Sequence, residues 1–246
     1  MEILLIFIVV TCYVFMQAIE IASLGSRVAG KLSGSLALGT TLQYSIYSGS
    51  KLFLVIFLPS LAYLVESGTT LNEYLLIVII SLFLTSLISL VVLLKFNFFQ
   101  YYFQKVFYYY EVSNLPKALL KALIVSNNKS ISCKNIEKFN MKKINNKKTN
   151  TSFLAYLFLV NGFFVSFLLT IIFPEYRLTL GQFVMVFHSF GALIVAFYLD
   201  PMLSRSLDRN DNDEIWSQNV YSIIYGRFLS YIFVFFIILI IFVICL

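Results

Sequence analysis

Six long apolar runs dominate this chain and limit what it can fold into. They cover about residues 3–26, 41–64, 73–96, 152–174, 178–200 and 219–245. An α-helix needs about 20 predominantly apolar residues to cross a bilayer, whereas a β-barrel shows alternating segments of about 10 residues. Hydrophobic residues make up 60% of the chain and charged residues only 12%, against roughly 25% charged in an ordinary soluble domain. The sequence therefore predicts an all-α polytopic membrane protein, with six transmembrane helices in a single transmembrane domain that covers residues 1–246.

The first apolar run begins almost at the N-terminus. Only Met1 and Glu2 precede it, without a basic segment, and no small-residue cleavage pattern follows it. A secretory signal peptide has both of these features. We therefore expect this run to be a retained membrane span.

Lysine and arginine are distributed unevenly among the predicted loops. The first, third and fifth loops carry 15 of them, if Lys95 at the edge of the third loop is included, whereas the other loops carry only Arg177. Loops that stay in the cytoplasm are enriched in these two residues. We therefore expect an N-out, C-out topology, with loop 97–150 in the cytoplasm.

Loop 97–150 has three parts that differ in chemistry. Residues 98–110 are dense in Phe and Tyr, which suits a helix that continues from the membrane into the headgroup layer. Residues 115–125 place leucines on one face and lysines on the other, which predicts a short interfacial helix. Residues 126–150 carry seven Lys and one Glu, equal to the whole net charge of +6, and we expect this tract to be solvated and flexible. The rest of the chain is neutral, so the basic charge is confined to this loop and does not indicate nucleic acid as a partner. Membrane lipids are the expected partners.

Five ionisable residues lie within or at the edges of the apolar runs: Glu20, Arg27, Lys51, Asp200 and Arg227. A charge in hydrocarbon costs several kcal/mol, and such residues usually face a cavity or a partner. At a rise of 1.5 Å per residue, these positions fall in the cytoplasmic half of their spans or near the midplane. If the helices face one another, they form a cationic cavity that opens to the cytoplasm. We expect Arg27, Lys51 and Arg227 to contact phosphate there, and Glu20 and Asp200 to hold these bases or to take part in gating.

Simpler interpretations of these charges stay open. The side chains of Arg27 and Arg227 are long enough to extend toward the phosphate layer. Glu20 can instead be a structural ion-pair partner of Lys51 or Arg227. These alternatives require no ligand.

Uncharged polar residues add two further features. The hydroxyl groups of residues 40–50 suit close helix packing as well as a sugar or phosphate ligand. Loop 27–40 is rich in Gly and Ser, which predicts tight or irregular backbone there, with a broken helix beside the cavity. Asn161, Gln182 and His188 are isolated polar side chains within spans, typical of interhelical hydrogen bonds. For His188, a supporting or gating role is the alternative.

Metal chemistry and hydrolytic catalysis are not indicated. His188 is the single histidine, and Cys12, Cys133 and Cys245 are far apart, so a zinc site is not expected. Neither H-E-x-x-H nor G-x-S-x-G occurs, which are motifs of metalloproteases and serine hydrolases. The fifth loop carries several carboxylates flanked by asparagines, which indicates a solvated turn: Asp208, Asp211, Asp213 and Glu214. We therefore expect no metal, no cofactor and no enzyme activity.

Short motifs occur in two segments, 20–51 and 199–228. They are Glu20, Ser26-Arg27, Ala29-Gly30 and Ser50-Lys51 in the first segment, and Asp200-Pro201, Asp208 and Gly226-Arg227 in the second. The spacing of these motifs and the layout of the six spans resemble those of the Amj-type lipid II flippases. The chain departs from that family at Lys51, where the family usually has Arg, and after Gly30, where the family is more basic.

This resemblance implies a flippase of the bacterial inner membrane. Such a protein moves an undecaprenyl-pyrophosphate-linked peptidoglycan precursor, lipid II or a related lipid-linked saccharide, from the cytoplasmic to the outer leaflet. A cationic cavity reached from the cytoplasmic leaflet is also what an amphiphile with a diphosphate requires. Two other classes stay open. One is a small-molecule or ion transporter of another class, and the other is a non-transporting scaffold that gathers anionic lipid or partner proteins with its basic loop.

Overall fold

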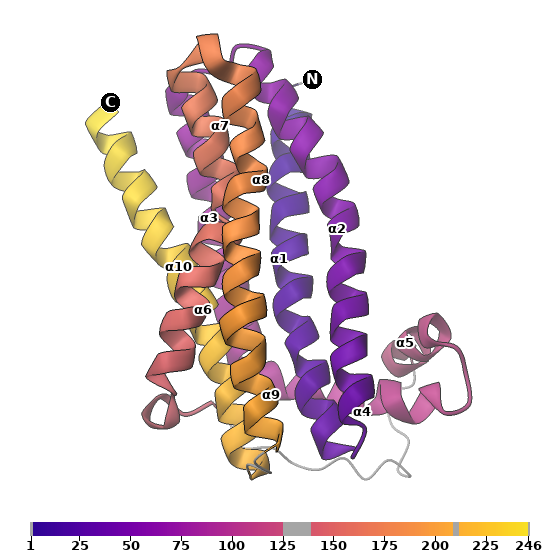
Figure 1. Cartoon of the computed structure of the whole chain (residues 1–246). Coiled ribbons are helices and arrows are strands. Elements are labelled where there is room, and N and C mark those ends of the chain that lie inside the picture. Colours follow the sequence, from indigo (N-terminus) through magenta and orange to yellow (C-terminus); the bar gives the residue numbers. More distant parts are fainter. Residues whose placement is uncertain (1, 125–138, 209–211, 246) are drawn as a thin grey trace.

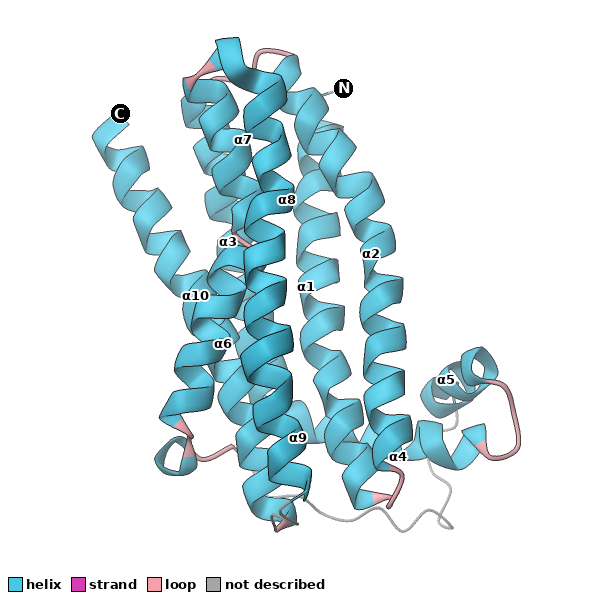
Figure 2. Cartoon of the chain, viewed as in Figure 1, coloured by secondary structure: helices cyan, strands magenta, loops and turns pink. Residues whose placement is uncertain are grey.

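Helices make up the regular structure of the described part of the chain. The computed structural model describes residues 2–124, 139–208 and 212–245, and no strand occurs in these ranges (Figure 2). Within them, six helical segments are long and apolar enough to cross a membrane: Glu2–Leu32, Leu36–Glu66, Leu71–Leu94, Asn146–Ile172, Pro174–Leu207 and Asp213–Cys245. The predictions of an all-α fold with six candidate spans, and of a multi-pass membrane protein, are confirmed.

The two chain termini lie at the same end of the helix bundle (Figure 1). Three helices lie toward the opposite end: α4 (Phe96–Tyr110), α5 (Leu115–Ile124) and α9 (Asp200–Asp208). Termini at the same end of the bundle agree with an even number of membrane crossings. The side of the membrane that holds the termini stays a prediction from the charge distribution.

Helices α1 (Glu2–Leu32) and α2 (Leu36–Glu66) form a tight hairpin. The Ser26 hydroxyl donates a hydrogen bond to the Gly39 carbonyl at 2.9 Å. A Cβ atom added at Gly30 would lie 2.7 Å from the Gly39 Cα, so only glycine permits this approach. This close contact of small residues agrees with the expected tight backbone. The expected irregular loop over 27–40 is wrong, because α1 and α2 continue through most of it.

The region after α3 (Leu71–Leu94) forms two helices, as the sequence predicts. Helix α4 packs against α1, and α5 packs against α4. Ala118 and Ala122 of α5 are buried, whereas Leu120, Leu123 and Ile124 are exposed. The position of this apolar face in the headgroup layer stays a prediction.

The fourth span is two helices, α6 (Asn146–Leu159) and α7 (Gly162–Ile172), with a break at residues 160–161. It begins earlier than the expected 152–174, because Asn145 caps α6 by accepting a hydrogen bond from the Lys148 N–H. Lys148 and Thr149 are buried. Residues 146–150 are therefore helical and not part of a flexible tract as expected, and of these Lys148 and Thr149 are not solvated. Residues 125–138 lie outside the described ranges.

The fifth span contains a π-helical turn. Helix α8 (Arg177–Ile194) continues into the π-helix η3 (Val195–Leu199) and then into α9. Pro201 has no N–H to donate, and its ring would clash with the carbonyl four residues earlier in a regular α-helix. The Asp200 N–H bonds instead to the Val195 carbonyl, which is the wider π spacing. The expected boundary at residue 200 is wrong, because α9 extends the helix into the predicted acidic loop.

Helix α1 lies at the centre of the packing. It contacts α2, α3, α4 and α10 (Asp213–Cys245), while α10 also packs on α3 and α6. An aromatic cluster fills the core beside α1, where the Tyr13 ring lies 4.7 Å from that of Phe164 and 5.6 Å from that of Phe57. Glu20 and Arg27 lie further along α1, toward its contact with α4.

Candidate functional site

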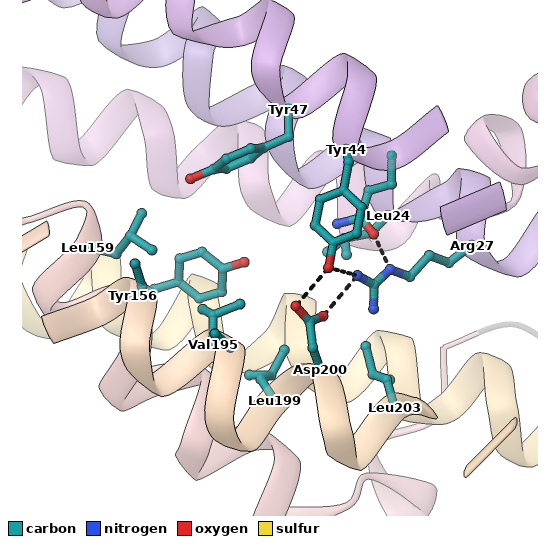
Figure 3. Close-up of a pocket in the computed structure, with 13 residues that line it drawn as sticks. Leu24, Arg27, Tyr44, Tyr47, Tyr156, Leu159, Val195, Leu199, Asp200 and Leu203 are labelled. Atoms are coloured by element: carbon teal, nitrogen blue, oxygen red, sulfur yellow. Dashed lines mark hydrogen bonds and ion pairs between the residues drawn. The ribbon is translucent and has the colours of Figure 1, made fainter. Parts of the chain in front are cut away.

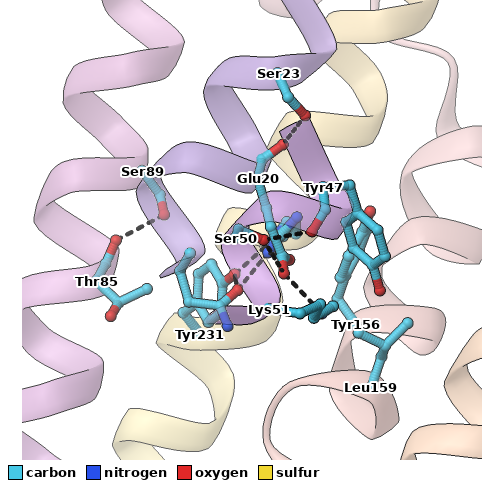
Figure 4. Close-up of polar contacts among 12 residues, drawn as sticks. Glu20, Ser23, Tyr47, Ser50, Lys51, Thr85, Ser89, Tyr156, Leu159 and Tyr231 are labelled. Atoms are coloured by element: carbon cyan, nitrogen blue, oxygen red, sulfur yellow. Dashed lines mark hydrogen bonds and ion pairs between the residues drawn. The ribbon is translucent and has the colours of Figure 1, made fainter. Parts of the chain in front are cut away.

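One buried carboxylate binds two bases from two other helices. Glu20 of α1 accepts from Lys51 Nζ of α2 at 2.8 Å through Oε1, and from Arg227 Nη2 of α10 at 2.6 Å through Oε2 (Figure 4). The side chains of Glu20 and Arg227 are each 1% exposed, whereas that of Lys51 is 26% exposed. Ser50 also donates to Glu20 Oε1, at 3.2 Å. We call Glu20, Lys51 and Arg227 the Glu20 cluster.

Arg227 is enclosed by polar and aromatic partners. Its Nε donates to the Tyr231 hydroxyl at 2.6 Å, and its Nη2 also donates to Gln17 Oε1. The Tyr231 hydroxyl donates to the same Gln17 oxygen at 2.8 Å. The guanidinium lies 4.3 Å from the centroid of the Tyr156 ring. Buried charges persist where partners of this kind replace water, so Arg227 is a structural centre joining α1, α6 and α10.

A second polar group lies toward the α9 end of the bundle. Arg27 Nη2 donates to Asp200 Oδ1 at 2.9 Å, and the Tyr44 hydroxyl donates to Asp200 Oδ2 at 2.8 Å (Figure 3). Arg27 also donates to the Tyr44 hydroxyl at 3.3 Å and, through Nε, to Gln43 Oε1. We call Arg27, Tyr44 and Asp200 the clasp, because it joins α1 and α2 to α9.

A pocket of about 190 Å³ lies beside the clasp. Its polar lining consists of the clasp residues with Gln43, Tyr47 and Tyr156, and its apolar lining comes from α1, α6 and the α8–η3–α9 segment. Helix α2 packs on α1, whereas α8 packs on α6 and α7; within the described residues α2 and α8 share no extensive contact. The pocket lies between these two helices, and side chains from both sides converge there in Figure 3. The π-helical turn places Val195, Ala196 and Leu199 in its wall.

Two tyrosines connect the pocket with the Glu20 cluster. Tyr47 and Tyr156 line the pocket. The same Tyr47 ring has Lys51 Nζ 4.1 Å from its centroid, and the Tyr156 ring covers Arg227. Cation–π contacts of this kind are worth about 0.5–2 kcal/mol. The pocket is therefore separated from two further bases by aromatic rings.

The charges of the two groups do not cancel. The clasp contains one base and one acid, whereas the Glu20 cluster contains two bases and one acid. One positive charge is left over among these five side chains. Because an uncompensated charge in a membrane interior is costly, the site favours an added anion.

The sequence-predicted residues fall into three places. Arg27 and Asp200 line the pocket, and Lys51 lies behind Tyr47 with a partly exposed side chain. Arg227 and Glu20 are buried, so the expected joint cavity of Arg27, Lys51 and Arg227 is not formed in this conformation. The structural ion-pair alternative describes Glu20, which pairs with both Lys51 and Arg227.

His188 is not part of the pocket lining. Its Nδ1 lies 3.3 Å from the Leu159 carbonyl, and its ring stacks on Phe163 at 5.9 Å between centroids. The α6–α7 break leaves the last carbonyls of α6 without their regular helical donors. His188 is placed to satisfy one of them, which is the interhelical hydrogen bond that the sequence predicts.

The hydroxyls at the start of α2 serve their own helix. Thr40, Thr41 and Ser45 each donate to the carbonyl one turn earlier, which is a common arrangement for these residues within helices. None of these three lines the pocket, in contrast to Tyr44 and Tyr47 on the same helix. Three partners of Arg227 were missed by sequence reasoning, although two of them have a spacing signal: Gln17 lies three residues before Glu20, and Tyr231 lies four after Arg227. Tyr156 has no such signal.

No metal centre is formed by the described residues, among which no group of three or more His, Cys, Asp or Glu side chains lies close enough to hold an ion. Comparisons with family models, with curated proteins and with solved structures found nothing that matches this chain. The site's own geometry is therefore the basis for a function.

Proposed function

We propose that this protein is a flippase for an amphiphile with an anionic phosphate headgroup, of the undecaprenyl-diphosphate-linked kind, in the bacterial cytoplasmic membrane. The observation that carries the proposal is the pocket between α2 and α8, lined by an arginine and flanked by a cluster with one positive charge in excess. An amphiphile needs both a polar site for its headgroup and a lateral path for its chain. Few other ligands need both.

The clasp supplies a physical means of opening the pocket. A phosphate that enters competes with Asp200 for the guanidinium of Arg27, and Arg forms strong paired hydrogen bonds with phosphate. Once displaced, the Asp200 carboxylate is repelled by the bound phosphate. Because Asp200 is the group through which Arg27 and Tyr44 hold α9, its release loosens the α9 side of the pocket.

The pocket volume limits what is held inside. Pockets that enclose a drug-sized ligand measure roughly 300–1,000 Å³, whereas this one measures about 190 Å³. It accommodates a phosphate or diphosphate group in this conformation. The saccharide and the polyprenyl chain of such a substrate would stay outside it, in water and in lipid respectively.

The decisive experiment measures flipping in proteoliposomes. A fluorescent undecaprenyl-diphosphate saccharide is reconstituted with the protein, and the fraction reached by an impermeant quencher is followed with time. We expect Arg27→Gln to reduce the flipping rate at least tenfold. The matched control is Arg177→Gln, which makes the same change at an exposed position outside the pocket and should leave the rate unchanged.

Three results would contradict the proposal. One is a flipping rate in the wild-type protein equal to that of empty liposomes. Another is equal rates for the Arg27→Gln and Arg177→Gln variants. The third is uptake of free diphosphate without flipping of the lipid, which would favour an ion transporter instead.

A further inference from the structure

Lys51 is the most accessible member of the Glu20 cluster. Its side chain is 26% exposed, whereas those of Glu20 and Arg227 are each 1% exposed. Tyr44, Tyr47 and Lys51 are spaced by three and four residues on α2, which places them along one face of the helix. The two tyrosines line the pocket beside the clasp, and Lys51 Nζ lies 4.1 Å from the centroid of the Tyr47 ring. Lys51 therefore lies one helical turn beyond Tyr47, on the side away from the clasp.

The carboxylate of Glu20 keeps a donor on each oxygen when Lys51 moves away. Arg227 binds Oε2 at 2.6 Å, and the Ser50 hydroxyl lies 3.2 Å from Oε1, the oxygen that Lys51 binds. The Ser50 proton is also directed at the Tyr47 carbonyl, at 2.7 Å, and it favours the carboxylate once Lys51 has left, because a charged acceptor binds more strongly. The remaining Glu20–Arg227 pair is neutral, so it avoids the cost of an unpaired buried charge.

The number of phosphates in a lipid-linked saccharide decides how many bases it needs. A saccharide joined through one phosphate carries one negative charge there, whereas one joined through a diphosphate carries two. Arg27 lines the pocket and supplies a base for the first phosphate. Lys51 supplies a second base, because its flexible four-carbon stem carries a compact charge that reorients without movement of the helix. A second phosphate therefore attracts Lys51 past the Tyr47 ring and into the pocket.

We propose that Lys51 exchanges Glu20 for the second phosphate of the substrate, and that this exchange makes the protein select a diphosphate-linked over a monophosphate-linked saccharide. The inference rests on the proposed function, because it concerns the ligand of the same pocket. Figure 4 shows Lys51 and Ser50 at the same carboxylate. Lys51 is the specificity-determining residue, and Ser50 is a positioning residue that holds the carboxylate during the exchange. With a single phosphate, Lys51 stays on Glu20.

The test compares two lipids that differ by one phosphate. Fluorescent undecaprenyl-monophosphate and undecaprenyl-diphosphate carriers of the same saccharide are titrated against the full-length protein in nanodiscs. We expect the wild-type protein to bind the diphosphate roughly tenfold more tightly, the effect of one hydrogen bond to a charged group. Lys51→Gln should reduce this preference to less than about twofold, by weakening binding of the diphosphate. Lys51→Arg should retain most of it, because arginine also binds phosphate.

Matched controls separate the exchange from general effects of charge and packing. Lys95→Gln makes the same change at an exposed position at the end of α3, outside the pocket lining, and should keep the wild-type preference. Ser50→Ala should reduce the preference, whereas Ser45→Ala, which removes a hydroxyl that donates to its own helix, should not. The preference is a ratio of two dissociation constants for one sample, so it does not depend on the folded fraction.

The possible failures are distinguishable. Equal binding of the two lipids by the wild-type protein, or an unchanged preference in Lys51→Gln, would overturn the inference and leave the flippase function standing. The same loss of preference in Lys95→Gln would also overturn it, because surface charge would then explain the effect. A preference that depends on Lys51 in a protein that moves neither lipid would support the exchange and contradict the flippase function alone.

Discussion

Arg227 Nη2 and Glu20 Oε2 lie 2.6 Å apart, although 207 residues separate them in the chain. Both side chains are 1% exposed. The pair joins the first and last spanning helices at a depth where neither charge has access to bulk water. Lys51 adds a second base to the same carboxylate, so Glu20 stabilises two cations at once.

The first prediction concerns that carboxylate. Glu20→Gln keeps the shape of the side chain but leaves Lys51 and Arg227 without a counter-charge. Removing one partner of a buried ion pair costs roughly 3–5 kcal/mol of the free energy of unfolding. Urea unfolding in detergent micelles measures this loss.

Two further variants make the first prediction specific. Glu66→Gln makes the same change at the exposed end of α2 and should be close to neutral. The double variant Glu20→Gln, Arg227→Gln should be less destabilised than the sum of its single variants, because residues in contact are coupled. A Glu20→Gln protein as stable as Glu66→Gln would show that the buried pair contributes nothing.

The second prediction concerns the close contact of α1 and α2. A Cβ atom at Gly39 would lie 2.7 Å from the Ser26 carbonyl oxygen, whereas one at Gly49 would meet nothing within 4 Å. Gly39→Ala should therefore lower the free energy of unfolding by about 1–3 kcal/mol. Gly49→Ala, on the same helix, should raise it by up to about 1 kcal/mol, because Ala favours helix over Gly. Equal effects in thermal unfolding would contradict this assignment.

The six spans were predictable because membrane crossing imposes length and apolar composition on each helix. The ends of these spans were harder to predict from the sequence. Small residues around Gly30 were interpreted as a loop, but they allow two helices to approach closely, and the sequence of one helix does not show its partner. The same limit explains Arg227. Its charge suggested Glu20 as one ion-pair partner, but only the fold shows that Glu20, Gln17 and Tyr231 bind it together.

The clasp shows a different limit. Arg27 and Asp200 were both identified from their charge, and Asp200 was expected to hold one of the bases, but which base it holds was not predictable, since 173 residues separate it from Arg27. Pro201 was a local signal for disturbed helix geometry. Its consequence, a π-helical turn that forms part of the pocket wall, depends on which helices pack against η3 and was not predictable from the sequence alone.

The third prediction concerns topology. The distribution of Lys and Arg places both termini outside, with Cys245 exposed at the end of α10 and Cys133 in the predicted cytoplasmic loop. In intact cells, an impermeant maleimide should label a Cys133→Ser protein at Cys245. It should fail to label a Cys245→Ser protein, in which Cys12 is buried. The reverse pattern would invert the orientation and place the clasp end outside.

The fourth prediction concerns His188. If its role is to satisfy the Leu159 carbonyl, His188→Gln retains a donor and should keep most of the stability, whereas His188→Ala loses one hydrogen bond, worth about 0.5–1.5 kcal/mol. Neither variant should lower the flipping rate per folded molecule by more than about twofold. A large loss of flipping in stably folded His188→Gln would instead assign the residue a role in gating.

The last prediction tests whether the clasp controls access to the pocket. Tyr44→Phe removes the hydroxyl that donates to Asp200 and leaves the ring in place. This hydroxyl also accepts from Arg27, but only its bond to Asp200 reaches α9. Loss of that bond, worth about 0.5–1.5 kcal/mol, shifts an opening equilibrium by about 2- to 12-fold. A cysteine at the buried pocket residue Leu24, in a protein whose native cysteines are Ser, reports this opening through its rate of reaction with a thiol reagent. That rate should rise by the same factor with Tyr44→Phe and stay unchanged with Tyr63→Phe, which alters an exposed tyrosine of α2 outside the pocket lining. Equal rates in the two variants would show that the pocket opens without breaking the clasp, and would remove Asp200 displacement from the proposed flipping step.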